Sequence, residues 1–312
     1  MNGLELSRDY FLNVAQPELR RVFPDLYSRL AVGLVGNGSE CFGYDDELSH
    51  DHDWGVDFFI WTVDRDGDSV SELQDWKVEF FNKHPPVFQR SRSEYGAHVG
   101  VMTCTGFYHS LIGVASGPQT LNEWMRAPEE NFAMAVNGEV FVDNAGEFLK
   151  TRCALLDYYP EDLRRKKIAS KCMALAQTGQ YNHERTAKRQ DWVTLRTVIS
   201  RFTDSAIALV FLLNKVYKPY YKWAFRALKD LPVLGGEVSQ LLLLIAENSA
   251  FDNESFSERQ RYISKLCDLF ISELRKQNLS DSGDWFLASH GEEVQSRIEN
   301  NSLRSLPAQY EC

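Results

Sequence analysis

The stretch VGNGSECFGYDDELSHDHDWG, residues 35–55, links two apolar segments that we expect to be strands, residues 31–35 and 56–63. Asp51 and Asp53 stand two residues apart at the head of the second segment, so on a strand both carboxylates point to the same face. Two adjacent carboxylates repel each other unless a cation lies between them, and Mg²⁺ fits because it takes oxygen ligands and shares them with substrate phosphates. The turn at Gly38 and Ser39 supplies backbone N–H groups and a hydroxyl for phosphate oxygens. The stretch therefore predicts a site for phosphoryl or nucleotidyl transfer.

The pair Gly38-Ser39, followed after residues 40–50 by Asp51-x-Asp53, resembles the signature of the DNA polymerase beta-like nucleotidyltransferase superfamily. The longer string GNGSECFGYDDELSHDHDWG, residues 36–55, is similar to one uncharacterised bacterial branch, domain of unknown function 4037. Similarity to that branch continues in YYP at 158–160, QTGQY at 177–181 and PYYKW at 219–223, and so extends over most of the chain. The resemblance implies a nucleotidyltransferase-like mixed sheet, a nucleoside triphosphate as substrate, and Mg²⁺ or Mn²⁺ as cofactor. It implies no particular acceptor.

Composition narrows the class of protein. The 312 residues carry a formal net charge of −10, which argues against general nucleic-acid binding because a phosphate backbone demands a basic surface. No apolar run approaches the roughly 18 residues that cross a bilayer, and the first residues lack a signal-peptide core. The six cysteines form no CxxC pair and are interpreted as reduced thiols. We expect a cytoplasmic protein of two domains, without a membrane partner.

The order of the apolar patterns predicts an α+β fold, with a nucleotidyltransferase-like α/β domain at residues 1–118 and a mainly helical domain at residues 119–312. In the first domain, helical spacing at 4–30 precedes strands at 31–35, 56–63 and 97–105, with a helix at 71–81 between the last two. Residues 138–146 are expected to form a small hairpin. Helical spacing in the second domain occurs at 121–126, 149–156, 162–177, 186–217, 220–228, 236–246, 257–277 and 292–300.

Members of the superfamily generally take a third metal-binding carboxylate from a neighbouring strand, and residues 98–103 provide none. Asp57 shares a strand face with Asp53 but would lie about 13 Å beyond it, at roughly 3.3 Å per residue, which is too far for a shared ion. Glu94 precedes the third strand and is a candidate. Two carboxylates with phosphate oxygens can hold one Mg²⁺, whereas a two-metal mechanism needs more ligands. Further candidate acids lie in the loop: Asp45, Asp46 and Glu47.

Histidines near the paired aspartates leave a second kind of metal site open. His50 and His52 bracket Asp51, as His-Asp pairs do in metal phosphohydrolases. That class requires further His or Asp ligands on helices, and the spacing of the remaining histidines shows no such pattern. His52 would also lie on the opposite strand face from Asp51, so we favour the nucleotidyltransferase.

Three cations of the helical half are candidates for binding the triphosphate. Arg185 and Arg189 stand near a helix start, and arginine can bind phosphate through two parallel hydrogen bonds. Lys222 lies between Tyr221 and Trp223 in one of the family-like stretches. The alternative interpretation of these residues is a solvated helix face.

The combined prediction is a Mg²⁺-dependent nucleotidyltransferase that moves an NMP group from an NTP to an unknown small-molecule or protein acceptor. The residues that would bind nucleotide are Gly38, Ser39, Arg185, Arg189 and Lys222, and the metal would be held by Asp51 and Asp53. The alternative is a catalytically weak or inactive nucleotide-binding or regulatory protein with the same fold.

Overall fold

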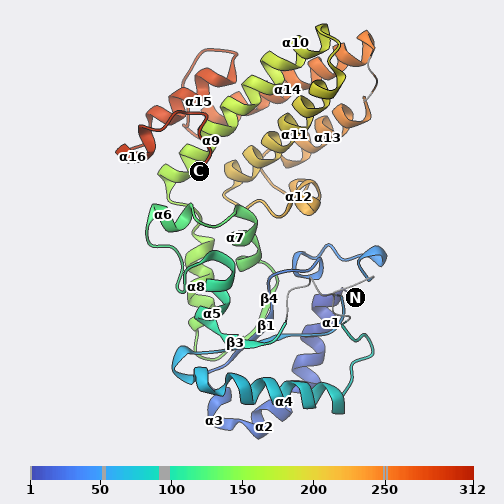
Figure 1. Cartoon of the computed structure of the whole chain (residues 1–312), viewed down its shortest axis with the longest axis vertical. Coiled ribbons are helices and arrows are strands. Elements are labelled where there is room, and N and C mark those ends of the chain that lie inside the picture. The colour runs from blue at the N-terminus through green and yellow to red at the C-terminus, as the bar shows by residue number, and fades with distance from the viewer. Residues whose placement is uncertain (1, 51–53, 91–98, 249, 251) are drawn as a thin grey trace. The chain divides into compact units, whose positions relative to one another are not determined.

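The computed structural model describes residues 2–50, 54–90, 99–248, 250 and 252–312 (Figure 1). The chain forms two compact units, Met1–Tyr158 and Tyr159–Cys312. The first unit contains a small mixed sheet with helices, and the second is built from helices. The predicted α+β class is therefore confirmed.

Helices precede the sheet in the first unit, as residues 4–30 predicted. α1 (Gly3–Tyr10) begins with a capping box between Asn2 and Glu5 and continues through a π-helical turn, η1 (Phe11–Ala15), into α2 (Gln16–Val22). Pro17 is accommodated because it stands in the first turn of α2, where its missing N–H is not needed. The helical path breaks at Phe23, which is non-helical before α3 (Pro24–Tyr27).

The sheet has the order β3-β2-β1-β4. β1 (Ala31–Leu34) is antiparallel to both β2 (Phe59–Thr62) and β4 (Glu139–Asp143), and β2 is parallel to β3 (Val101–Thr103). Every residue of β1 and β2 is buried, which explains their continuous apolar sequences. Gly33 lies at the register shift between β1 and β4, and a Cβ there would stand 2.4 Å from the carbonyl oxygen of Glu139.

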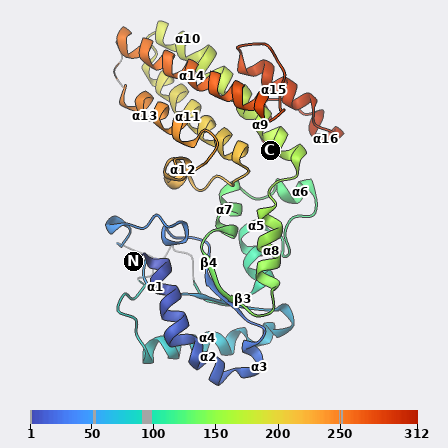
Figure 2. The same ribbon diagram turned by 180° about the vertical axis from the view of Figure 1, so that it is seen from behind.

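Helices cover both faces of this sheet (Figure 1 and Figure 2). The N-terminal helices and α4 (Val70–Lys83) pack on the face that carries Val32 and Ile60. α5 (Cys104–Ile112) and α8 (Glu147–Leu156) supply aromatic rings to the other face, where Trp61 stacks on Phe148 with ring centroids 4.0 Å apart. The candidate functional site is built on this sheet and its covering helices.

The segment expected to form a hairpin, 138–146, instead contains β4, whose partner is β1. The reason is that β1 is central and has a second edge to fill, and a strand more than 100 residues later in the chain fills it. The helices on either side of β4, α7 (Glu129–Val136) and α8, also belong to the first unit, as does α6 (Leu121–Trp124). The predicted boundary after residue 118 thus falls inside this unit.

The second unit consists of helices around one apolar core. α9 (Glu161–Leu175) packs against α11 (Trp192–Asn214) and α15 (Leu287–Ser296), and α13 (Gly235–Glu247) packs against α14 (Asn253–Lys276). The helix predicted at 186–217 is divided, because Gln190 has a left-handed φ of 57° and Asp191 caps α11. The remaining elements are η5 (Ala176–Asn182, π-helical), α10 (His183–Lys188), α12 (Tyr221–Leu228) and α16 (Asn301–Arg304).

α11 is the one helix among the described residues that is long and apolar enough, by length and composition alone, to cross a membrane. The sequence predicted no such segment. In the structure 61% of its most apolar stretch is buried inside the unit, as expected for a core helix. This packing is compatible with a soluble protein.

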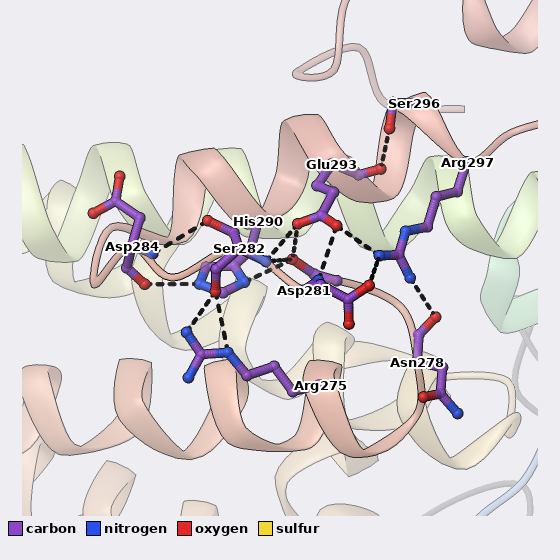
Figure 3. Close-up of polar contacts among 10 residues, drawn as sticks. Arg275, Asn278, Asp281, Ser282, Asp284, His290, Glu293, Ser296 and Arg297 are labelled. Carbon is purple, nitrogen blue, oxygen red and sulfur yellow. Dashed lines mark hydrogen bonds and ion pairs between the residues drawn. The ribbon is translucent and has the colours of Figure 1, made fainter.

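The turn between α14 and α15 is held by buried polar side chains (Figure 3). His290 Nδ1 lies 2.9 Å from Ser280 Oγ, and both side chains are fully buried. Burial raises the pKa of the Glu293 carboxyl, but its hydrogen bonds outweigh burial and bring that pKa down to about 2. Those bonds come from Ser280 Oγ, Asp281 N, Ser282 N and Arg297 Nη2.

Candidate functional site

The loop that follows β1 has the backbone geometry of a tight turn. Gly36 and Gly38 adopt φ angles of 115° and 117°, which side chains rarely tolerate. The Asn137 amide fixes the loop from the side, since it accepts from Gly36 N and donates to Gly36 O, each at 2.7 Å. Gly138 N also donates to Cys41 O at 2.7 Å. The turn is therefore held rigidly against the segment that enters β4.

Ser39 begins a short 3-10 turn, η2 (Glu40–Phe42), and is partly exposed. Its hydroxyl makes no capping bond and has no hydrogen-bond partner among the residues that the structure describes. A hydroxyl without a hydrogen-bond partner, next to two glycines with positive φ, is the arrangement that the sequence predicted for phosphate binding. The two predicted cradle residues, Gly38 and Ser39, are thus placed at the surface of a preformed turn.

Glu40 lies beneath this turn with an exposure of 1%. Its carboxylate packs on Gly38, where an ideal Cβ would stand 2.6 Å from Oε2, and its Oε1 lies 2.7 Å from Arg90 Nη1. Burial raises the pKa of Glu40, and the nearby Arg90 offsets part of that rise. Arg90 therefore favours the charged form of a carboxylate that supports the turn, against the effect of burial.

The other acids of the loop serve its architecture. Asp45 Oδ2 accepts from Gly3 N at 2.7 Å and from Trp54 Nε1 at 3.0 Å, which ties the loop to the start of α1. Asp46 Oδ1 accepts from Ser49 N and Ser49 Oγ, both at 3.1 Å, and closes its own turn. Glu47 opens the 3-10 turn η3 (Glu47–His50).

The predicted metal ligands Asp51 and Asp53, and the candidate Glu94, lie outside the described residues. Within the described ranges, no three His, Cys, Asp or Glu side chains gather in a way that could hold a metal ion. A Mg²⁺ site at this loop therefore rests on Asp51 and Asp53, and it stays a prediction.

Asp57, which the strand spacing placed too far away for a shared ion, has a different partner. Its Oδ1 lies 2.6 Å from Lys77 Nζ of α4, and both side chains are more than nine-tenths buried. Lys77 also lies over the rings of Phe58 and Phe81. The sequence contained a signal for this pair, since Lys77 falls on the apolar face of α4 beside Trp76. We did not use it.

An open cavity of about 470 Å³ adjoins the ion pair in the first unit. α4 contributes one wall, and the residues before β2 and after α4 contribute the others. Arg90 connects this cavity to the Gly38 turn through Glu40. The lining residues are Val56, Asp57, Gln74, Lys77, Val78, Phe81, Asn82, Pro85, Pro86, Gln89 and Arg90.

The predicted triphosphate-binding cations belong to the second unit. Arg185 of α10 donates to the Tyr181 hydroxyl at 2.5 Å and lies over that ring. Arg189 directly follows α10 and is exposed. Lys222 is exposed on α12, with its Nζ 4.9 Å from the centre of the Trp223 ring. Their participation in a nucleotide site stays a prediction.

Residues 124–224 match the family described as a domain of unknown function, DUF4037. The matched segment begins at the end of α6 and reaches into α12, and it includes the stretches at 158–160, 177–181 and 219–223. Comparisons with curated proteins and with solved structures gave no significant match. The chain thus contains, within an α+β fold, a segment similar to a domain whose function is not assigned.

Proposed function

We propose that the protein is a Mg²⁺-dependent nucleotidyltransferase, which moves an NMP group from an NTP to a small-molecule or protein acceptor. The observation that carries the proposal is the turn after β1, which contains two glycines with positive φ and the unengaged Ser39 hydroxyl. Residues 40–50 separate this turn from Asp51 and Asp53 in the sequence. Rigid backbone N–H groups and a hydroxyl bind phosphate oxygens without reorganisation.

In this proposal Gly38 and Ser39 bind the triphosphate, with Arg185, Arg189 and Lys222 as further phosphate ligands. The oxygen ligands for the metal are Asp51 and Asp53, which suit Mg²⁺ or Mn²⁺. The bound ion supplies neutralisation of the charge that develops on the phosphates. The acceptor oxygen would release its proton to water and bond to the α-phosphorus, while the bond to pyrophosphate breaks and pyrophosphate leaves with the electron pair.

The test compares isosteric substitutions within one loop. Asp51→Asn and Asp53→Asn are expected to weaken Mg²⁺-dependent binding of labelled NTP by about 100-fold or more, because each removes a ligand charge. Asp46→Asn is the matched control, since the asparagine oxygen can still accept the bonds that close its turn. Pyrophosphate release is measured with the same variants. Binding of Mg²⁺-NTP by both Asp51→Asn and Asp53→Asn at the parent affinity would refute the proposal.

A second function is favoured by one feature of the sheet. β3 is the strand beside β2, and its residues Val101, Met102 and Thr103 carry no carboxylate. An incomplete metal site slows phosphoryl transfer more than it weakens nucleotide binding, because the chemistry depends on placement of charge. A regulatory nucleotide-binding protein would therefore bind Mg²⁺-NTP without releasing pyrophosphate.

A further inference from the structure

The cavity beside α4 contains a buried cation that is incompletely satisfied. The Arg90 side chain is 7% exposed, and its Nη1 lies 2.7 Å from Oε1 of Glu40 as an ion pair, without the alignment of a hydrogen bond. Across the described part of the chain, Glu40 is the only group within hydrogen-bond or ion-pair distance of this guanidinium. Nη1 is therefore a buried donor without a hydrogen-bond partner, on a residue that lines the cavity.

The second cation of the cavity differs from Arg90. Lys77 is engaged by Asp57 at 2.6 Å and reaches toward the carbonyl oxygen of Val99 at 3.5 Å. Its role is structural, because it joins α4 to the segments that enter β2 and β3. A buried charged donor without a hydrogen-bond partner costs free energy. Arg90, and not Lys77, is therefore the cation that would bind a ligand in this cavity.

The other lining residues indicate the size and chemical groups of a ligand that would fit the cavity. Phe81, Pro85 and Pro86 are the apolar lining residues on this side, and Asn82 and Gln89 add amide groups to the lining. A volume of about 470 Å³ falls in the range of roughly 300–1,000 Å³ that is usual for small-molecule sites. A guanidinium matches a planar carboxylate or a phosphate through paired hydrogen bonds.

We propose that this cavity binds a small organic anion. Its carboxylate or phosphate group pairs with Arg90, and its apolar body lies against Phe81 and the two prolines. The site uses neither the Ser39 hydroxyl nor Asp51 and Asp53, so it stands whether or not the protein transfers nucleotides.

The experiment titrates the protein, without nucleotide, with benzoate, phenyl phosphate and the uncharged benzamide at constant ionic strength, followed by calorimetry or ligand-observed NMR. We expect at least one anion to bind with a Kd below about 10 mM and about 10-fold or more tighter than benzamide. The stronger of the two anions distinguishes a carboxylate ligand from a phosphate ligand.

Three variants assign the binding to the cavity. In the double variant Glu40→Gln/Arg90→Gln both charges are removed together, so no unpaired charge stays buried, and the preference for anions should disappear. Val78→Phe leaves the ion pair in place but fills the cavity, and should weaken binding of every probe. Val193→Phe is the matched control, because Val193 is 79% exposed on α11 in the other unit.

Equal binding of benzoate, phenyl phosphate and benzamide would overturn the proposal, as would the absence of binding by both anions. It would also be overturned if the Val78→Phe variant bound the preferred anion as the parent does. Loss of that binding in Val78→Phe, with parent-like binding in Val193→Phe, supports the site even if the double variant fails to fold.

Discussion

Gly38 and Gly36 offer a matched pair for testing how the turn after β1 is built. Both have nearly the same φ, 117° and 115°, so an alanine at either position meets the same backbone strain. Their surroundings differ. An added Cβ at Gly38 would lie 2.6 Å from Oε2 of Glu40, whereas at Gly36 it would find no atom within 4 Å. The difference between the two substitutions therefore isolates the contact with the Glu40 carboxylate.

The expected losses of folding free energy follow from the backbone strain at both glycines and from the contact with Glu40 at Gly38 alone. Strain at a positive φ costs about 1–3 kcal/mol, and Gly36→Ala should reduce the free energy of unfolding by that amount. Gly38→Ala adds overpacking of about 1–3 kcal/mol, because Glu40 is buried and paired with Arg90 and cannot move aside freely. We expect Gly38→Ala to be the more destabilising substitution by about 1–3 kcal/mol.

Urea unfolding gives the free energies, and hydrogen exchange of peptides that cover residues 31–45 reports the first unit separately from the second. The same comparison in a Glu40→Ala background completes a double-mutant cycle. Once the carboxylate is gone, Gly38→Ala should cost no more than Gly36→Ala. Equal costs of the two glycine substitutions in the parent background, or an unchanged excess without Glu40, would refute this account of the turn.

Two further predictions concern buried charge. Lys77→Met should destabilise the first unit by about 3–5 kcal/mol, because it leaves Asp57 buried without its cation. Urea unfolding of the double variant Asp57→Asn/Lys77→Met should show that most of this loss is recovered. A loss that is not recovered would contradict the pairing. Glu293→Gln should reduce the free energy of unfolding by on the order of 1–3 kcal/mol at pH 7. The pKa of Glu293 is about 2 in the folded protein and about 4.5 in the unfolded chain, so its charged form stabilises the fold above pH 4.5. That stabilisation is lost as the pH falls toward 2. Urea unfolding at pH 7 and pH 3 should show the difference from the parent shrinking at low pH, with the exposed Glu292→Gln as control, and a difference independent of pH would contradict the assignment.

Local signals predicted the strand β1 and the turn that follows it. The apolar run at 31–35, which ends before Gly36, predicted β1, and the glycine-serine pair predicted the turn that follows it. β2 is shorter than the predicted 56–63, because the N–H groups of Asp57 and Phe58 donate to the side chains of Ser7 and Asp57 and not to a neighbouring strand. Asn137 could not be foreseen, since its contact with Gly36 joins residues 101 positions apart and leaves no periodic signal in the sequence.

In the helical half the pattern of apolar spacing found the elements but not all their ends. The apolar spacing alone predicts one helix over residues 186–217. Asp191, however, is a favourable N-cap, and its side chain accepts a hydrogen bond from Thr194 N at 3.1 Å. Giving that capping residue more weight would have placed the start of α11 at Trp192. The packing of α11 in the core, by contrast, follows directly from its apolar stripe.

The network around the turn also limits which carboxylates can serve a metal ion. Glu40 would have to break a buried ion pair with Arg90, which costs about 3–5 kcal/mol, and so is the poorest ligand in the loop. Asp45 would give up its bonds to Gly3 and Trp54, and with them the anchor to α1. Asp51 and Asp53 therefore stay the predicted ligands of a metal ion at this loop. For this reason the comparison of their asparagine variants with Asp46→Asn decides between a metal-dependent site and a turn that serves structure alone.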